Sequence, residues 1–136
     1  MNEHNYSFEK LEVWQKARAY VSTIYKLTES FPDVEKFGLI SQLRRASISI
    51  VSNIAEGTSG SSLKDQVRFT EIAYGSAIET YCQLIVSMDL GLISATDFES
   101  TKAMLNEITV KLSGLKNSQI KRLNEQQTLI PKRRSL

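Results

Sequence analysis

With 136 residues, of which 41% are hydrophobic and 24% charged, and a net charge of +2, the chain matches a single domain and is too apolar for an intrinsically disordered protein. Residues 1–6 lack the apolar stretch of a signal peptide, no apolar run approaches the roughly 20 residues of a membrane helix, and the single cysteine, Cys82, excludes an internal disulfide. We therefore expect a cytoplasmic protein that does not contact a membrane.

The first half of the chain predicts two helices, because apolar residues recur at three- and four-residue steps. We expect the first helix over residues 8–29. Pro32 suits the first turn of a second helix, which we expect to end near residue 56, with Gly57 as its left-handed cap. The apolar stripes comprise Trp14, Ala17, Val21 and Ile24 in the first helix, and Ile40, Leu43, Ser47, Ile50 and Ile54 in the second.

The second half predicts two more helices with the same spacing. Ser62, followed three residues later by Asp65, resembles a capping box that opens the third helix, and Gly91 follows its expected end near residue 90. The fourth helix opens at Ser94 or at Thr96, each with an acidic residue three positions on. Its stripe comprises Phe98, Thr101, Leu105, Ile108, Leu112 and Leu115, and Ile120 and Leu123 prolong it.

Four amphipathic helices joined by short loops predict an all-α fold, an antiparallel up-down-up-down four-helix bundle. The stripes follow nearly the heptad spacing that favours left-handed packing. We assign residues 1–125 to the bundle. Residues 126–136 carry no packing pattern, and we expect them to form a flexible basic tail.

The inventory of reactive side chains argues against an enzyme. His4 is the only histidine, so serine or cysteine chemistry has no base and a di-metal site has no pair of Glu-x-x-His motifs. Residues 57–60 include two glycines but lack the Gly-Lys-Ser/Thr of a phosphate-binding loop. Cys82, beside Ile85 and Val86, is expected in the core rather than as a nucleophile. We expect no catalysis, no cofactor and no metal.

Positive charge is concentrated near the C-terminus. Residues 1–110 contain 10 Lys and Arg against 14 acidic residues, whereas residues 111–136 contain 7 against 1. This asymmetry favours contact with a polyanion, and a solubilising tail is the alternative. No aromatic residue follows Phe98, so a nucleic acid would be held by its phosphates rather than by base stacking. The basic candidates in this part are Lys116, Lys121, Arg122, Lys132, Arg133 and Arg134.

An ion pair between the second and third helices is also expected. Glu79 shares a helix face with small and apolar residues, which predicts a partly buried carboxylate. A buried charge without a partner costs about 3–5 kcal/mol, so we expect Arg45 to pair with it; two solvated surface charges are the alternative. Gly75 weakens the helix and indicates a close helix approach, within the bundle or between subunits. The shared face comprises Ile72, Gly75, Glu79, Cys82 and Val86.

Four segments of the chain resemble a known family. Residues 8–17 read F-x-x-L-x-V-W-Q-K-A, residues 38–46 read G-L-I-S-Q-L-R-R-A, residues 52–57 read S-N-I-A-E-G, and residues 68–79 read R-F-x-x-I-A-x-G-S-A-x-E. These motifs resemble the four-helix-bundle proteins encoded by intervening sequences in bacterial 23S ribosomal RNA genes. The relatives include the accessory variability determinant of diversity-generating retroelements, and the resemblance extends to about residue 115.

The resemblance implies a four-helix bundle that assembles into a homopentameric ring. For the accessory relatives it implies binding to nucleic acid and to a reverse transcriptase; the label ribosomal protein, which members often carry, reflects where some genes lie. Relatives often carry arginine in the loop after S-N-I-A-E-G, but here residues 58–62 contain none. The resemblance implies structural roles for Arg45, Asn53, Glu56, Gly57 and Glu79, and it leaves Arg44, Lys64, Arg68 and the C-terminal end to supply positive charge.

Together these features favour a non-catalytic oligomeric protein that contacts structured RNA or an RNA–DNA hybrid through phosphates. A ring would repeat each basic patch around its axis, so individually weak contacts would gain avidity. The alternative is a protein–protein adaptor, for example for a reverse transcriptase, that does not itself bind nucleic acid.

Overall fold

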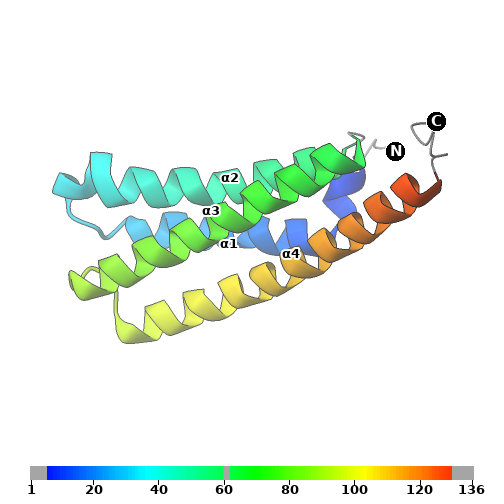
Figure 1. Ribbon diagram of the computed structural model, residues 1–136. Coiled ribbons are helices and arrows are strands. Elements are labelled where there is room, and N and C mark those ends of the chain that lie inside the picture. Colours follow the sequence, from blue (N-terminus) through cyan, green and yellow to red (C-terminus); the bar gives the residue numbers. More distant parts are fainter. Residues whose placement is uncertain (1–5, 60–61, 130–136) are drawn as a thin grey trace, which may run out of the picture.

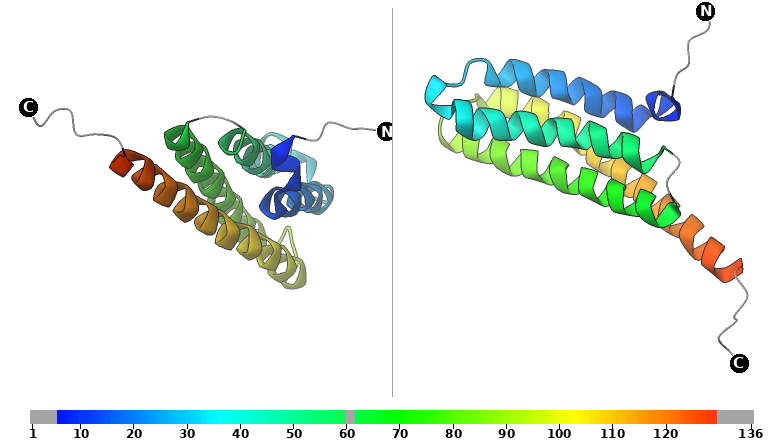
Figure 2. Two further views of the ribbon diagram at one scale, coloured as in Figure 1. Left: turned by 90° about the vertical axis from the view of Figure 1, so that its right-hand side faces the viewer. Right: turned by 90° about the horizontal axis from the view of Figure 1, so that it is seen from above.

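Four long helices make up most of the protein. The computed structural model describes residues 6–59 and 62–129, in which α1 spans Glu12–Thr28, α2 Ser41–Gly57, α3 Leu63–Asp89 and α4 Ala95–Leu129, without any strand. Successive helices run in opposite directions, and the last turns of α4 project beyond the other three (Figure 1, Figure 2). The prediction of an all-α fold with four long helices is confirmed, and the left-handed twist stays a prediction.

The core lies between the four helices. Tyr20 and Ile24 of α1 have no exposed surface, and the other three helices contribute apolar residues that are buried to a similar extent. Burial of such side chains is the main favourable term in folding, at about 25 cal/mol for each Å² removed from water. The buried apolar residues are Leu43, Ala46, Ile50 and Ile54 of α2, Ala73, Ala77 and Leu84 of α3, and Phe98, Leu105, Ile108 and Leu112 of α4.

The regular part of α1 begins later than the sequence predicts. Ser7–Lys10 forms a separate 3₁₀ turn, η1, because Leu11 has an extended backbone with φ −74° and ψ 129°. The ring of Phe8 meets that of Trp14 edge-on, with centroids 5.0 Å apart. This aromatic contact packs η1 against the first turn of α1.

The prediction that the second helix begins at Pro32 is wrong. Asp33–Glu35 (η2) is a 3₁₀ turn and Lys36–Ile40 (η3) is a π-type turn, so that α2 starts only at Ser41. Gly38 has φ −111° and ψ −112°, far from helical values. A glycine tolerates this geometry because it has no Cβ. The non-helical backbone at Gly38 interrupts the helix before Ser41.

Gly57 is not the left-handed cap that the sequence predicts, but the buried last residue of α2. Among the glycines in the described ranges, Gly91 alone has a positive φ, of 74°, and it follows α3 as expected. A Cβ at Gly57 would lie 3.2 Å from Phe69 Cβ and 3.3 Å from Thr70 Oγ1. The glycine therefore serves the close approach of α3 to the end of α2.

Serine hydroxyls cap the first turns of α3 and α4. Ser62 Oγ accepts a hydrogen bond from the backbone N–H of Asp65 at 3.2 Å, and Ser94 Oγ accepts one from that of Asp97 at 3.0 Å. Each satisfies a donor that the helix itself leaves free. Of the two predicted starts of α4, the structure has the one at Ser94.

Two ion pairs join α1 to α4. Lys16 Nζ lies 3.3 Å from Glu107 Oε1, and Lys111 Nζ lies 2.5 Å from Glu12 Oε1. The hydrogen bond from Lys111, together with its charge, holds the pKa of Glu12 below its ordinary value. Because both pairs are exposed to solvent, they orient α4 along α1 more than they stabilise the fold.

α4 continues past the predicted boundary between bundle and tail. Residues 126–129 are helical and exposed, although the sequence assigns them to a flexible tail. No glycine or proline lies between Gly114 and Pro131, so no strong helix breaker ends α4 earlier. Residues 130–136, the rest of the predicted tail, lie outside the described residues.

Candidate nucleic-acid interface

A buried pair of hydrogen bonds fixes the start of α3 beside the last third of α4. Thr70 Oγ1 donates to Gln119 Oε1 at 2.8 Å, and Gln119 Nε2 donates to the carbonyl oxygen of Gly57 at 3.4 Å. The Gln119 side chain is fully buried, and a buried amide is tolerated only with such partners. The end of α2, the start of α3 and the last third of α4 therefore meet at one end of the bundle.

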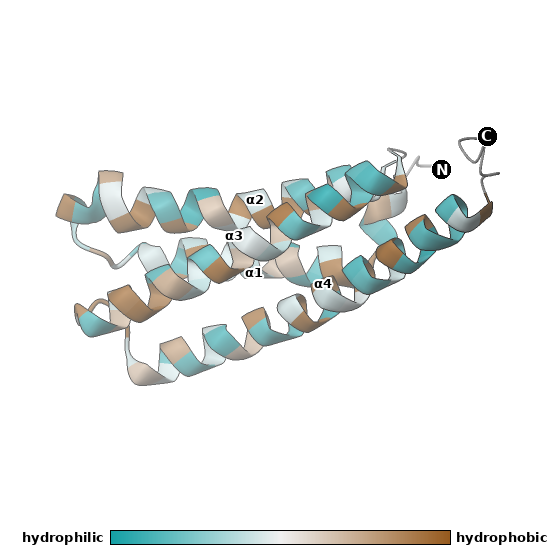
Figure 3. Ribbon diagram, viewed as in Figure 1, coloured by the Kyte–Doolittle hydropathy of each residue, from teal (hydrophilic) through white to brown (hydrophobic). Residues whose placement is uncertain are grey.

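Four basic side chains are exposed at this end. Lys64 and Arg68 lie on the first two turns of α3, and Lys121 and Arg122 lie on α4. The Arg68 guanidinium lies 4.6 Å from the centre of the Phe69 ring, and none of the four forms an ion pair within the described chain. Hydrophilic residues predominate at the start of α3 and along the last turns of α4 (Figure 3). The structure thus places four of the predicted phosphate contacts at the same end of the bundle.

Lys116 lies further along α4 toward the middle of the bundle and already has a partner. Its Nζ is 3.0 Å from Glu71 Oε2, with the two side chains 38% and 50% exposed. A pair this open to water contributes about 0–1 kcal/mol, so Glu71 holds Lys116 only weakly. Asp65 and Glu125 also lie on these turns, so the surface carries both signs of charge.

Arg44 does not join this group. Its Nε donates to Thr28 Oγ1 at 2.9 Å, one Nη donates to the carbonyl oxygen of Tyr25 at 3.3 Å, and its guanidinium stacks 4.5 Å from the Tyr25 ring. These contacts satisfy acceptors at the end of α1, on the opposite side of the molecule. The remaining predicted contacts, Lys132, Arg133 and Arg134, lie outside the described residues.

Arg45 and Glu79 form an ion pair between α2 and α3, with Nη2 3.1 Å from Oε2. The two side chains are 65% and 40% exposed, so the Glu79 carboxylate is partly buried and paired with Arg45, as the sequence predicts. Gln83 Nε2 donates to the same Glu79 oxygen at 3.1 Å. Solvent screening limits the pair to about 0–1 kcal/mol, and its effect is to align the two helices.

The face of α3 that carries Glu79 points outward. Cys82 is exposed rather than in the core, and a Cβ at the exposed Gly75 would meet no atom within 4 Å. Gly75 therefore serves no close approach within the bundle. Hydropathy favours the wrong face because the buried residues are mostly small or polar, namely Thr70, Ala73, Ser76, Ala77, Thr80, Gln83, Leu84 and Ser87.

The S-N-I-A-E-G segment forms the last turns of α2, which pack against α3. Asn53 Nδ2 donates to the carbonyl oxygen of Ser49 at 2.9 Å and lies 3.1 Å from its hydroxyl, which shares a 2.8 Å hydrogen bond with Ser76 Oγ. Gly57 allows α3 to approach the end of α2 closely, because it has no Cβ. The side chain of Glu56 is exposed. Asn53 and Gly57 thus contribute to helix pairing, which sequence periodicity alone does not indicate.

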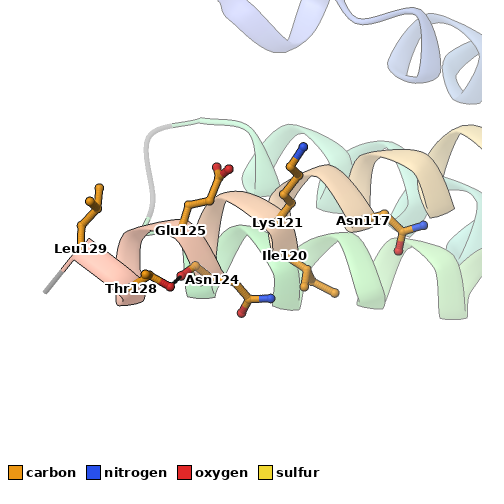
Figure 4. Close-up of a pocket in the computed structure, with 7 residues that line it drawn as sticks. All are labelled: Asn117, Ile120, Lys121, Asn124, Glu125, Thr128 and Leu129. Atoms are coloured by element: carbon orange, nitrogen blue, oxygen red, sulfur yellow. Dashed lines mark hydrogen bonds between the residues drawn. The ribbon is translucent and has the colours of Figure 1, made fainter.

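An open hollow follows the projecting turns of α4 (Figure 4). Every lining residue comes from α4, and Lys121 and Glu125 point to the same side of it (Figure 4). A hollow with one helical wall cannot enclose a small molecule, so it is a surface feature rather than a ligand pocket. The lining residues are Asn117, Ile120, Lys121, Asn124, Glu125, Thr128 and Leu129.

Residues 6–59 and 62–129 contain no group of three His, Cys, Asp or Glu side chains placed to hold a metal ion. None of the helices in these ranges combines the length and the apolar character needed to cross a membrane.

A family model for 23S rRNA-intervening sequence proteins matches residues 9–114. The chain belongs to this family. A similar crystal structure is that of a protein with unknown function from the S23 ribosomal protein family of Bacteroides thetaiotaomicron, with a TM-score of 0.71 and 26% identity over 76% of this chain and 97% of that one. No curated protein matches the chain at a significant level.

The family assignment made from the motifs is confirmed. The 23S rRNA-intervening sequence family match ends at residue 114, so it includes Lys64 and Arg68 but stops before Lys116, Lys121 and Arg122. The basic end of α4 therefore lies outside the matched family region. Neither the family nor the Bacteroides protein is a known enzyme.

Proposed function

We propose that this chain is a non-catalytic cytoplasmic protein that forms a homo-oligomer, a pentameric ring by resemblance, and contacts structured RNA or an RNA–DNA hybrid through phosphates. The observation that supports the proposal is the cluster of Lys64, Arg68, Lys121 and Arg122 at one end of the bundle. Three further basic residues, 132–134, follow the end of α4 closely in sequence.

Phosphate contacts suit this surface better than base recognition does. Ammonium and guanidinium groups bind phosphate oxygens without reading sequence, and the described cluster presents only one aromatic ring, Phe69, which lies beneath Arg68. The acidic neighbours Asp65 and Glu125 weaken the attraction of a single copy for a polyanion. Repetition of the cluster in an oligomer would raise the affinity through avidity.

A double substitution tests the cluster. Arg68→Gln with Lys121→Gln removes one cation from each helix while leaving the buried contacts of Gln119 intact. Binding of a fluorescently labelled RNA hairpin is measured from about 50 to 200 mM salt, a range over which phosphate contacts weaken steeply. We expect weaker binding at low salt. The slope of log affinity against log salt concentration should also become smaller in magnitude by about two, one for each lost phosphate contact.

The matched control is Lys26→Gln with Lys36→Gln. Both lysines are exposed, and they lie toward the opposite end of the bundle, at the end of α1 and in η3. This control removes the same net charge and should leave the affinity and the salt dependence almost unchanged. Equal effects of the two double variants, or binding that does not respond to salt, would contradict the proposal.

A protein–protein adaptor is the second candidate function, and the opposite end of the molecule favours it. Val34 and Phe37 are 84% and 88% exposed. Phe37 borders a hollow that is also lined by Tyr25, Ile40 and Ile48. An aromatic side chain beside an apolar hollow is typical of the anchors in protein interfaces.

The reverse transcriptase of a diversity-generating retroelement is the partner that the family resemblance implies. A complex with that enzyme that persists in high salt, is lost in Phe37→Ser and is retained in the Arg68→Gln and Lys121→Gln double variant would favour the adaptor. The reverse pattern would favour binding through phosphates.

A further inference from the structure

The outward surface of α3 is more apolar than its buried surface. Ile72, Ile78 and Val86 are 39%, 45% and 44% exposed, whereas the residues that α3 buries are mostly threonine, serine and alanine. Gly75 and Cys82 lie between these aliphatic side chains on the same outward side. We call these five residues the outer face of α3. A helix that faced only water would show the opposite distribution.

The outer face of α3 also lacks charge. From Ile72 to Val86 the only charged residue is Glu79, and α2 has none from Ala46 to Ala55. Glu79 is paired with Arg45 of α2, so the strip has one charge of each sign. A polyanion requires several cations, and this strip therefore does not suit nucleic acid.

The size of the strip suits the apolar centre of a protein interface. Fifteen residues of α3, at about 1.5 Å each, span roughly 22 Å, and two adjacent helices are about 20 Å wide, which gives on the order of 450 Å². A standard interface buries about 800 Å² on each partner, with an apolar centre and a polar rim. The exposed Glu71 and Asp89 flank this stretch along α3 and supply such a rim.

We propose that the outer face of α3 packs against a second copy of this chain. The inference rests on the proposed homo-oligomer and names the surface that holds it together. The charges on the strip, one of each sign, match a partner with nearly balanced charge, and the chain itself has 17 basic and 15 acidic residues. Gly75, with no atom within 4 Å of its Cβ position, leaves room at the centre of the face for a side chain or backbone of the other copy.

Gly75→Lys tests the proposal without disturbing the single chain. A side chain at this position meets nothing within the chain, and lysine is a better helix former than glycine. It also lies four residues from both Glu71 and Glu79, a spacing that favours helix-stabilising ion pairs. We expect Gly75→Lys to sediment near the 15.4 kDa of one chain at a concentration at which the wild type is assembled.

Gly114→Lys is the matched control. Gly114 is an exposed helical glycine of α4, and a Cβ there also meets nothing within 4 Å. The control makes the same substitution with the same change of charge on a different face, and we expect it to assemble like the wild type. A Gly75→Lys protein that assembles as well as Gly114→Lys would overturn the proposal.

Cys82 provides a second readout at the face itself. It is the only cysteine of the chain and is exposed in a single copy, so its reaction with a thiol reagent reports whether the face is covered. We expect the assembled wild type to react about tenfold or more slowly than Gly75→Lys, and to speed up on dilution. Equal rates in the two proteins would place the subunit contact elsewhere, and a wild type that is monomeric would also overturn the inference.

The RNA titration separates these outcomes from the proposed function. Gly75→Lys and Gly114→Lys leave Lys64, Arg68, Lys121 and Arg122 in place, so each monomer keeps its phosphate contacts. An assembled wild type with a protected Cys82 and no affinity for RNA would support the interface and contradict phosphate binding. Salt-dependent RNA binding by a wild type in which Cys82 reacts freely would support phosphate binding and contradict the interface.

Discussion

Tyr20 has the largest of the fully buried side chains, and its hydroxyl lies 2.9 Å from Thr80 Oγ1. Thr80 gives its own hydrogen to the carbonyl oxygen of Ala77 at 2.7 Å, so Tyr20 is the donor in the first bond. Burial raises the pKa of Tyr20 to about 12, because the tyrosinate would lose its hydration. The core therefore holds this phenol in its neutral form.

Tyr20→Phe should change the stability at alkaline pH. An unfolded tyrosine ionises near pH 10, whereas folded Tyr20 keeps its proton up to about pH 12. Between these values the unfolded state holds fewer protons, so the wild-type free energy of unfolding falls by about 1.4 kcal/mol per pH unit through this residue. Tyr20→Phe should cost about 1 kcal/mol at pH 7 and lose this dependence.

Urea unfolding of both proteins at pH 7 and at several values between about 10 and 11.5 measures the difference. The two stabilities should approach each other as the pH rises, and Tyr20→Phe should become the more stable near the top of the range. The two proteins share every other ionisable group, so the contributions of those groups cancel in the comparison. A difference that stays constant over the whole range would mean that Tyr20 does not hold its proton.

The contact between α2 and α3 depends on the absence of a side chain at Gly57. In Gly57→Ala the new methyl would lie 3.2 Å from Phe69 Cβ and 3.3 Å from the backbone oxygen of Gln66, so α3 has to shift. Overpacking of this kind costs about 1–3 kcal/mol, which exceeds the helix propensity that alanine gains. Gly114→Ala is the control, because it fills open space on an exposed face of α4 and should stabilise by up to about 1 kcal/mol. Thermal unfolding that shows the same sign for both variants would contradict this role of Gly57.

At the scale of elements, the positions of the long helices follow from the sequence, whereas several details of their packing do not. Periodic apolar residues and the capping serine at position 94 predict α4 correctly. Gly91 adopts the positive φ expected of a glycine that follows the end of α3. Gly57 reads as a cap because a helix ends there, but only the path of α3 reveals that Phe69 needs the space. Periodicity marks a helix terminus and cannot show what packs against it.

The face of α3 shows why the candidate sites were only partly predictable. Hydropathy ranks Ile72 and Val86 above Thr80 and Ser87, so periodicity assigns the isoleucine side to the core. In the structure Thr80 and Ser87 are buried instead. Each hydroxyl donates a 2.7 Å hydrogen bond to a backbone carbonyl of α3, so neither needs water as a partner. Small bonded hydroxyls also let neighbouring helices approach closely, a benefit that no hydropathy scale includes.

At the scale of the whole molecule, the features that bear on binding are separated in space. The cations of α3 and α4 lie at the end where α4 projects, the exposed Val34 and Phe37 lie near the other, and the neutral outer face of α3 lies between them (Figure 1). An oligomer joined through that outer face would leave both ends free. The separation allows a substitution to change one of these surfaces while leaving the residues of the other two in place.

The tail offers the clearest test of this separation. Replacing Lys132, Arg133 and Arg134 together with glutamine removes three cations that follow the end of α4 in sequence. If these residues contact phosphates, a labelled RNA hairpin should bind more weakly. The slope of log affinity against log salt concentration should fall in magnitude by about two to three. The oligomer mass and the protection of Cys82 should not change, because the tail is not part of the outer face of α3. Unaltered RNA binding would assign the phosphate contacts to Lys64, Arg68, Lys121 and Arg122 alone, whereas a smaller oligomer would show that the tail takes part in assembly.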